Sequence, residues 1–339
     1  MTEQPQKLGI DTSTPMITVN QVRKHFTVGN PLMAAMRGGA TVVKAVDGVT
    51  FSLKRGESVG LLGESGCGKT TMGRLLLKLE DTTDGDIQFE GEDLTTFRGE
   101  SLKRYRTRAQ MIFQNPFDAL NPRFTIAQSM AEPLNNIGMG RGEQADRIRH
   151  AMELVHLPNP DLFLDRYPHQ MSGGQLQRVV MARALILEPA FVVADEPVSM
   201  LDVSVRAGIL NLFREVRESL GLMAVYISHD LALVRYVCER TIVMYLGCIV
   251  EDGPTEDIVH EPMHPYTKAL VAAVPVPHPD QSHDPLPIKP GAPDARNPPS
   301  GCRLRDRCPL AFDRCANEEP RAIQVGNRKV HCHLFDQTA

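Results

Sequence analysis

The chain has 339 residues, of which 42% are hydrophobic and 23% are charged, and its formal net charge is −4. This length and composition indicate a globular protein with a substantial core, built as one large domain with an appendage or as two domains. The slightly acidic balance disfavours a nucleic-acid partner, and the sequence contains neither a secretory signal nor a run of about 18 apolar residues that would span a bilayer.

The first part of the chain has the pattern of β-strands. Residues 17–26 are rich in β-forming side chains, and residues 42–63 alternate between apolar and polar side chains. Between them, glycine and proline in residues 27–41 predict an inserted loop. Residues 85–94 return to the pattern of a strand and a turn. Two dipeptides in the second segment predict further turns, Asp47-Gly48 and Arg55-Gly56.

A phosphate-binding loop follows. Residues 63–70, GESGCGKT, fit the pattern G-x-x-x-x-G-K-[ST] between an apolar strand and a helix expected at 70–79. The glycines let backbone N–H groups turn inward around phosphate oxygens, and the helix N-terminus adds partial positive charge. Lys69 would reach the β and γ phosphates of a nucleotide, and Thr70 would offer its hydroxyl to Mg²⁺. The predicted nucleotide-binding residues are Gly63, Glu64, Ser65, Gly66, Cys67, Gly68, Lys69, Thr70 and Thr71.

An ordinary strand–turn–helix junction is the alternative interpretation of this segment. The strand, the loop pattern and the helix are all in register, so we favour the phosphate loop. Within it, Cys67 is expected to be a small residue that fits the loop, although a thiol at a helix N-terminus can become reactive.

Further along the chain, helical and strand patterns alternate. Residues 143–157 place Ile148, Met152 and Val155 at the spacing of one helix face. Residues 191–195 and 223–228 are short apolar runs bounded by helical patterns, which is typical of buried parallel strands.

Two acidic residues end the first of these apolar strands. Asp195 is placed to hold Mg²⁺, and Glu196 is placed to polarise an attacking water. Alone, two acids at a strand end are weak evidence. Together with the phosphate loop, they predict a site for nucleotide hydrolysis.

The segment MSGGQLQR, residues 171–178, predicts a second helix N-terminus with exposed N–H groups. Here the chain resembles the ATP-binding-cassette (ABC) ATPases, whose signature is LSGGQ; Met171 replaces the leucine. The resemblance implies that the signature of one subunit closes over the γ-phosphate of an ATP held by another. The residues implied to contact nucleotide in this way are Ser172, Gly173, Gly174 and Gln175.

Other positions match landmarks of the same family. Gln114 resembles the glutamine that touches Mg²⁺ and the attacking water, and His229 resembles the histidine that bridges the γ-phosphate and the catalytic glutamate. Asp202 ends the segment SMLD, residues 199–202, which resembles the D-loop of the family. Phe26 resembles the aromatic residue that stacks on adenine, and core packing is the alternative role for it.

Four segments together narrow the resemblance to the oligopeptide/dipeptide permease ATPases, most closely their F-type subunit: RYPHQMSGGQLQR, ARALILEPAFVVADEPVSMLDVS, HEPMHPYTKAL and NPPSGCRLRDRCP. The resemblance implies a peripheral ATPase on the cytoplasmic face of the inner membrane that powers uptake of di- and oligopeptides. The implied partners are a second ABC ATPase subunit forming a heterodimer, two transmembrane permease subunits and a periplasmic or extracellular peptide-binding protein, with no nucleic acid.

Near Gln114, the side chains of Phe117, Leu120 and Phe124 would line the groove that receives the permease helices. The alternative function is a soluble mechanical or redox-regulated ABC ATPase that takes no part in transport.

The expected fold class is α/β. It is a P-loop ABC cassette with a mostly parallel core sheet, an antiparallel β subdomain and a helical subdomain at about 115–180. Because 14 of the 25 prolines lie beyond Gly253, we expect a loop-rich appendage there. The predicted divisions are an N-terminal tail at 1–16, the ABC ATP-binding domain at 17–253 and the C-terminal domain at 254–339.

Four of the seven cysteines lie in this C-terminal part: Cys302, Cys308, Cys315 and Cys332. Disulfides are not expected in the reducing compartment that we assign. Four thiolates suit a [4Fe–4S] cluster by ligand chemistry, and the resemblance adds weight, so we expect a structural cluster that folds the tail. Zinc, with His331 or His333 as a further ligand, and four independent free thiols are the alternatives.

Overall fold

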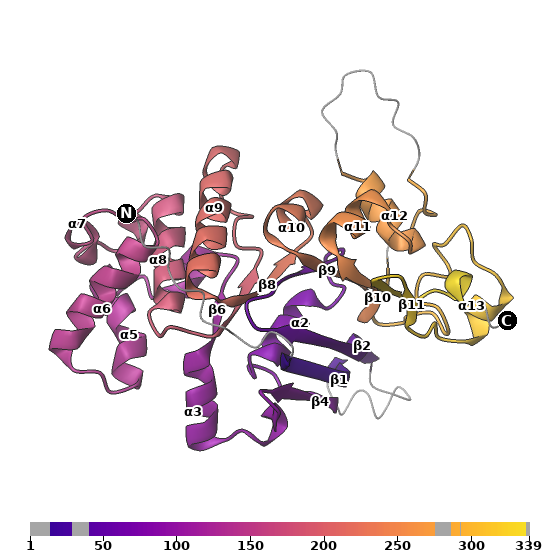
Figure 1. The fold of residues 1–339 in the computed structure, drawn as a ribbon, viewed down its shortest axis with the longest axis horizontal. Helices are drawn as coiled ribbons and strands as arrows, with labels where there is room; N and C mark the ends of the chain where they lie inside the picture. The colour runs from indigo at the N-terminus through magenta and orange to yellow at the C-terminus, as the bar shows by residue number, and fades with distance from the viewer. Residues whose placement is uncertain (1–13, 29–40, 275–285, 292, 337–339) are drawn as a thin grey trace, which may run out of the picture.

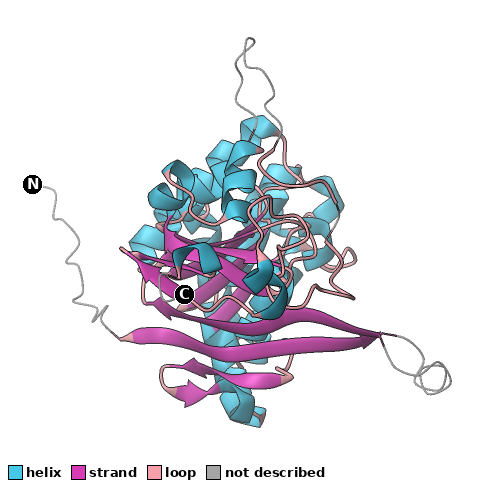
Figure 2. Cartoon of the chain, turned by 90° about the vertical axis from the view of Figure 1, so that its right-hand side faces the viewer, coloured by secondary structure: helices cyan, strands magenta, loops and turns pink. Residues whose placement is uncertain are grey.

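The computed structural model describes residues 14–28, 41–274, 286–291 and 293–336. Two sheets organise these residues, one of four strands and one of eight. In Figure 2 the long antiparallel strands form a layer on one side of the core sheet, and most helices lie on the other side. The α/β fold class with a parallel core sheet and an antiparallel sheet is confirmed.

The antiparallel sheet has the order β2-β1-β4-β5. Apolar side chains at alternating positions, such as Ile17 and Val19, are fully buried, because one face of this sheet packs on the core. Figure 1 shows the sheet beside helix α2. Its strands are β1 (Pro15–Val28), β2 (Thr41–Lys54), β4 (Asp84–Phe89) and β5 (Glu92–Asp93).

The turn predicted at Asp47-Gly48 is wrong, because β2 continues through both residues. Val22 pairs with Val49 and Arg23 pairs with Asp47, so Gly48 is left without a partner in the register. Its φ of 77° is readily adopted by glycine, and the result is a β-bulge. The turn at Arg55-Gly56 is confirmed. Of the predicted loop at 27–41, the two ends belong to strands and residues 29–40 lie outside the described residues.

The core sheet has the order β11-β12-β10-β9-β3-β8-β7-β6, and β9, β3, β8, β7 and β6 pair in parallel. The central strands β3, β7 and β8 are buried throughout, which explains their nearly continuous apolar sequences. The parallel strands are β3 (Ser58–Leu62), β6 (Ala109–Ile112), β7 (Phe191–Asp195), β8 (Met223–Ser228) and β9 (Arg240–Tyr245).

Helices connect these strands and cover the sheet. The helix predicted at 70–79 begins one residue earlier and ends sooner, as α2 (Lys69–Leu76). The other helices around the sheet are α3 (Gly99–Arg108), α9 (Val203–Leu220) and α10 (Leu231–Val237), and a 3₁₀ turn η1 (Leu94–Thr96) precedes α3.

A group of helices lies at one end of the molecule, on the left of Figure 1. The helix predicted at 143–157 is α6 (Arg141–Leu154), and its buried Ile148 and Met152 face this group's core. The members are α4 (Pro116–Ala119), α5 (Ile126–Asn136), α6, α7 (Asp161–Leu164), the 3₁₀ turn η2 (Pro168–Gln170) and α8 (Gly173–Leu185).

The C-terminal region is joined to the cassette more closely than a loop-rich appendage would be. Strand β12 pairs with β10 in antiparallel register, with Glu251 opposite Val330, so the region extends the core sheet. Its Leu304 belongs to the same apolar cluster as the helical group. The last strand of the cassette is β10 (Cys248–Pro254), and the elements of the C-terminal region are α11 (Thr255–His260), α12 (Pro265–Ala272), α13 (Asp313–Asn317), β11 (Ile323–Val325), β12 (Arg328–Val330) and η3 (His333–Phe335).

Candidate active site

The loop between β3 and α2 is shaped by its glycines. Gly63, Gly66 and Gly68 all have positive φ, of 155°, 79° and 105°. A Cβ on Gly68 would lie 2.0 Å from the carbonyl oxygen of Ala45, and one on Gly63 would lie 2.3 Å from that of Met244. The loop is therefore pressed against two neighbouring strands, and only glycine fits at both positions.

Lys69 folds back over this loop. Its Nζ donates hydrogen bonds to the carbonyl oxygens of Gly63 and Glu64, at 2.7 and 2.9 Å, and the side chain is buried. A buried ammonium group held at the first residue of α2 makes the loop a strong site for an anion, since the helix N-terminus carries partial positive charge as well.

The acids at the end of β7 face the loop. The Thr70 hydroxyl donates to Oδ1 of Asp195 at 3.3 Å. Burial raises the pKa of Asp195, and the hydrogen bond from Thr70 opposes that rise. A hydroxyl and a carboxylate thus converge where a phosphate-bound Mg²⁺ would need oxygen ligands.

Glu196 is held from two sides. Gln114 Nε2 donates to its Oε2 at 2.9 Å, and His229 Nδ1 lies 2.7 Å from its Oε1. The residue has a φ of 45°, which is unusual for a non-glycine residue, and its own N–H donates to the carbonyl oxygen of Ile227.

These groups meet because parallel strands end at the same edge of a sheet. The loop at 63–71 follows β3, and Gln114 follows β6. Asp195 ends β7 and Glu196 comes directly after it, while His229 follows β8. A cavity of about 670 Å³ lies at this edge. It is lined by all the predicted loop residues except Cys67, together with Gln114, Asp195, Glu196 and His229.

Three further residues line the cavity and were not predicted: Val43, Ala45 and Leu270. Val43 and Ala45 are two residues apart on β2, so their side chains lie on the same face of the strand. The alternation of residues 42–46 was the one feature of the sequence that could have placed them together. Leu270 comes from α12, about two hundred residues from the loop, and no local pattern points to it.

Other predicted nucleotide contacts lie elsewhere. None of Ser172, Gly173, Gly174, Gln175 and Asp202 lines this cavity. Ser172 caps α8: its hydroxyl accepts from the N–H of Gln175 at 3.3 Å, and the Gln175 side chain accepts from the N–H of Ser172 at 3.1 Å.

Phe26 and Cys67 do not line the cavity either. Phe26 is on β1, with the Lys24 ammonium 4.9 Å above the centre of its ring. Cys67 is buried, and burial raises the pKa of its thiol, so it is a neutral side chain that fills space beneath the loop.

Comparison with known proteins decides the family. Residues 46–199 match the family described as ABC transporter, and residues 250–315 match the oligopeptide/dipeptide transporter C-terminal region. The oligopeptide transport ATP-binding protein OppF of Salmonella typhimurium is 46% identical over 332 residues, which cover 96% of this chain and 98% of that protein. The chain belongs to the ABC transporter family.

Other relatives of this ABC transporter subunit carry similar names. The dipeptide transport ATP-binding protein DppF of Escherichia coli is 41% identical, with 95% of each chain covered. A putative peptide import ATP-binding protein of Brucella ovis is 47% identical over 93% of this chain and 96% of that protein. The chain is an ATPase subunit, and such subunits bind ATP and work with membrane permease subunits.

A solved ABC structure has the same fold. It is the dimeric post-hydrolysis state of the ATP-binding cassette MJ0796 bound to ADP and Pi, which is 27% identical with a TM-score of 0.61 and covers 71% of this chain and 99% of that one. Among the described residues of our ABC subunit, no helix is long and apolar enough to cross a membrane.

The iron–sulfur prediction for this ABC subunit is corrected. Cys302, Cys308, Cys315 and Cys332 are buried and unpaired, but no group of three or more His, Cys, Asp or Glu side chains in the described part of the chain is placed to hold a metal ion. The names of the oligopeptide and dipeptide relatives mention no such centre. The [4Fe–4S] cluster is therefore not supported, and nor is zinc.

Burial accounts for these four cysteines without a metal. It raises the pKa of Cys302 and of Cys332 to about 11, and the other three thiols contribute to the rise at Cys332. Protonated thiols pack as small apolar side chains. Three of the four belong to the main apolar cluster of the molecule, so the cysteines contribute to its core.

The tight fit of Gly68 in this ABC subunit leads to a prediction. Gly68→Ala should lower the free energy of unfolding by about 2–5 kcal/mol, because overpacking costs about 1–3 kcal/mol and positive φ about 1–2 kcal/mol. It should also weaken MgATP binding, since the added methyl group pushes the loop away from Ala45. Denaturant titration and nucleotide titration measure the two effects.

The matched control is Gly91→Ala. Gly91 has a φ of 84°, and a Cβ added there would meet no heavy atom within 4 Å. This variant should show only the cost of positive φ, about 1–2 kcal/mol, and normal MgATP binding. Equal stability of the two variants would contradict the close packing of the loop on β2.

Proposed function

We propose that this ABC subunit hydrolyses ATP to power uptake of di- and oligopeptides through separate membrane permease subunits. The observation that carries the ATPase assignment is Glu196, held between Gln114 and His229 beside the phosphate loop. The peptide class is supported by the match of residues 250–315 and by the names of the oligopeptide and dipeptide relatives.

Each residue has a distinct role in the proposed reaction. Glu196 accepts a hydrogen bond from the water that attacks the γ-phosphate and increases its nucleophilicity. Gln114 and His229 orient this carboxylate, and His229 keeps Nε2 for the γ-phosphate. Lys69 exchanges its two loop carbonyls for β and γ phosphate oxygens when ATP binds.

Mg²⁺ fits the oxygen groups that converge here. Thr70 and Asp195 already share a hydrogen bond, and Gln114 donates through its nitrogen, which leaves its amide oxygen for the ion. When bound, the ion neutralises the charge that develops on the phosphates.

Two cassettes act together in this proposal. Ser172 to Gln175 and Asp202 lie outside the chain's own nucleotide cavity, so they are available to the ATP held by a second cassette. The N-terminus of α8, capped by Ser172, offers backbone N–H groups to that phosphate. The dimeric relative bound to ADP and Pi supports a pair of cassettes. The second subunit is a related ATPase, so the pair is a heterodimer, and Phe26 stacks on the adenine.

The permease helices dock on apolar side chains next to Gln114. Phe117 and Phe124 are 50% and 37% exposed, as a docking surface requires. Leu120, predicted for the same groove, is 5% exposed and belongs to the core, so that assignment is wrong. Phe113, 40% exposed, takes its place.

The remaining parts of the proposal concern assembly. The subunit lies peripherally on the cytoplasmic face of the inner membrane, and a peptide-binding protein delivers substrate to the two permeases. The proposed divisions are the tail at 1–16, the ATP-binding domain at 17–253, with the helical subdomain at about 115–180, and the C-terminal domain at 254–339. Strand β1 already begins at Pro15, so the last two residues of the proposed tail belong to the first sheet. No observation favours the alternative of a mechanical or redox-regulated ATPase.

Reconstitution tests this function. The subunit, its partner ATPase and the two permeases in liposomes, with the binding protein outside, should accumulate labelled di- or oligopeptide only when MgATP is supplied on the ATPase side. The same preparation carrying Lys69→Ala in this chain should not sustain full uptake. ATP hydrolysis that responds to nucleic acid or ribosomes and ignores the permeases would support the alternative.

A further inference from the structure

The segment His264 to Thr267, HPYT, has no role in the function described so far. It forms the start of α12, with Pro265 as the first helical residue. His264 is the cap: its Nδ1 accepts from the N–H of Tyr266 at 3.1 Å. The N–H of His264 donates in turn to the fully buried Glu251 of β10, at 2.9 Å. The histidine and the proline therefore fix where the next residue, Tyr266, is placed.

The cap at His264 does not depend on pH in the physiological range. The side chain is 1% exposed, and burial lowers its pKa to about 3. The ring is therefore neutral and keeps Nδ1 as an acceptor for the N–H of Tyr266.

Tyr266 reaches the phosphate loop. Its side chain is fully buried, and its hydroxyl accepts a hydrogen bond from the backbone N–H of Glu64 at 2.8 Å. Its ring packs on that of Tyr245, with centres 4.6 Å apart. One helical turn further along α12, Leu270 lines the nucleotide cavity. This helix of the C-terminal region thus forms part of the ATP site.

A second residue of the C-terminal region acts on the same loop residue. Arg307 Nη1 lies 3.3 Å from each carboxylate oxygen of Glu64 and 3.3 Å from the hydroxyl of Tyr245. The carbonyl oxygen of Glu64 accepts from Lys69 at 2.9 Å. Every polar group of Glu64 is therefore bonded, its N–H and carboxylate by the C-terminal region and its carbonyl by the lysine of the phosphate loop.

The C-terminal region is also linked to the other end of the phosphate loop, at Cys67. The buried Arg303 donates to the carbonyl oxygen of Leu246 at 3.2 Å and forms an ion pair with Asp47 on β2. The backbone links this pair to the loop, because Asp47 N–H donates to Gly247 O at 2.9 Å and Gly247 N–H donates to Cys67 O at 3.0 Å.

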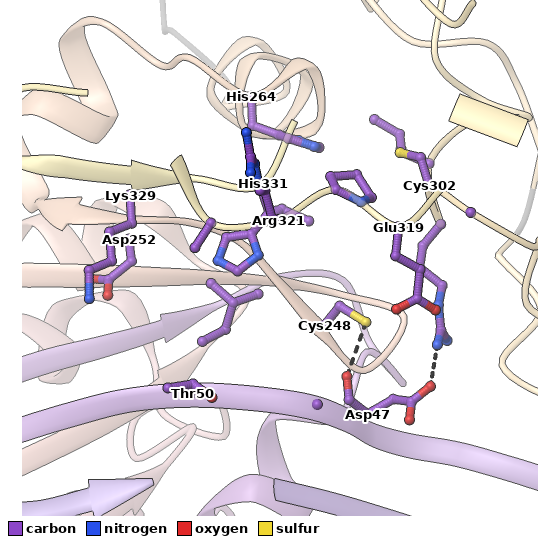
Figure 3. A pocket seen from close by; sticks show the side chains of 18 of the residues that line it. Asp47, Thr50, Cys248, Asp252, His264, Cys302, Glu319, Arg321, Lys329 and His331 are labelled. Carbon is purple, nitrogen blue, oxygen red and sulfur yellow. Dashed lines mark hydrogen bonds and ion pairs between the residues drawn. The ribbon is translucent and has the colours of Figure 1, made fainter. Parts of the chain in front are cut away.

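Figure 3 shows this junction, with Asp47 on the strand side and Cys302 and Glu319 on the side of the C-terminal region. A cavity of about 610 Å³ separates the two sides. Two of the acids on its walls, Asp47 and Asp252, are already paired with arginines, and we assign it no ligand.

We propose that the C-terminal region holds the phosphate loop in its nucleotide-binding conformation through Tyr266 and Arg307, which are positioning residues acting on Glu64. This inference rests on the nucleotide site proposed above. Because coupling between two sites is reciprocal, ATP binding also tightens the packing of α12 and of the segment that carries Arg303 and Arg307 against the cassette.

Tyr266→Phe in the full chain tests the proposal. It removes one hydroxyl and leaves the buried ring, so the N–H of Glu64 loses its acceptor and the loop populates other conformations. The apparent Kd for MgATP rises in inverse proportion to the competent fraction. We expect about tenfold weaker binding in a calorimetric titration, equivalent to about 1.4 kcal/mol. KM for ATP should rise by a similar factor, with a smaller change in kcat.

The matched control is Tyr236→Phe, which removes a tyrosine hydroxyl that donates to Asn211 on the surface. It should bind MgATP as the wild type does. Arg307→Gln and Arg307→Lys are independent tests that do not alter the core. Gln should weaken MgATP binding about threefold to tenfold, an effect of the size expected for one lost hydrogen bond, and Lys should restore part of the affinity.

A second measurement separates positioning from simple destabilisation. In the wild type, MgATP should slow proteolytic cleavage of the C-terminal region at least severalfold. In Tyr266→Phe, saturating MgATP should give clearly less protection, even though the site is filled. A variant that is only less stable would cleave faster with and without nucleotide, but would keep the same ratio.

Lys69→Ala distinguishes failure of this inference from failure of the nucleotide site. If Lys69→Ala loses MgATP binding while Tyr266→Phe and Arg307→Gln bind within twofold of the wild type, the positioning role is overturned and the site stands. If Lys69→Ala binds MgATP normally, the site itself is misassigned. Should Tyr266→Phe not fold, Arg307→Gln and the protection ratio decide.

Discussion

Glu196→Gln should lower ATP hydrolysis by about 10²–10⁴-fold, the range attributed to a positioned general base. Glutamine keeps the length and shape of the side chain but is a much weaker acceptor for the attacking water. In the structure the carboxylate faces Gln114 through one oxygen and His229 through the other. An amide offers only one oxygen, so one of these two neighbours would also lose its partner.

MgATP binding should survive in Glu196→Gln. The phosphate loop, Lys69 and the Thr70–Asp195 pair are unchanged, so the variant should trap ATP in a closed pair of cassettes. Rapid-quench hydrolysis and nucleotide titration measure the two properties. Glu215→Gln on the exposed face of α9, where the carboxylate pairs with His156, is the control and should hydrolyse ATP normally. Turnover of Glu196→Gln close to that of the wild type would refute the assigned base.

Ser172→Arg should abolish hydrolysis in the assembled transporter and leave the ATP affinity of the isolated subunit nearly unchanged. Ser172 does not line the subunit's own nucleotide cavity, so the arginine cannot disturb binding there. Its bulk instead fills the space at the N-terminus of α8 that a second cassette's γ-phosphate must enter. The measurements are ATPase activity of the complex and MgATP titration of the monomer.

The loss of the α8 cap must be separated from this effect. Removing the Ser172 hydroxyl costs about 1 kcal/mol of stability, the usual value for an N-cap. Thr125 caps α5 with the same reciprocal pair of hydrogen bonds, to Gln128, so Thr125→Arg should reduce monomer stability by a similar amount. If Ser172→Arg abolished ATP binding by the monomer, the signature would act within its own chain and the two-cassette arrangement would be wrong.

Local sequence patterns were enough to predict most of the strands and helices. The continuous apolar runs at 191–195 and 223–228 predicted buried parallel strands correctly, because a strand covered on both faces needs apolar residues throughout. The pair Asp47-Gly48 was misread, since the same dipeptide suits a turn and a glycine bulge, and the choice between them depends on the partner strand.

The residues of the nucleotide site also differ in how far the sequence could predict them. The phosphate loop and the two acids could be located from sequence because their chemistry requires fixed residue types at fixed spacing. The bond between Glu64 and Tyr266 could not, since it joins residues 202 positions apart. For the cysteines, the sequence led instead to a site that the structure does not support. Four thiols in one segment suggested a metal centre, but ligand geometry is not a property of spacing, and burial gives these side chains a role in packing.

The pairing of β12 with β10 has a consequence for how the chain folds as it is synthesised. Strand β10 ends at Pro254, but its partner begins at Arg328. Until the ribosome has released that later segment, one edge of the nearly complete core sheet has unpaired N–H and C=O groups. Open edges of this kind invite pairing with other chains. The last strand to emerge therefore protects the newly made subunit from aggregation, and nascent chains stalled before residue 328 are the ones that would depend on chaperones.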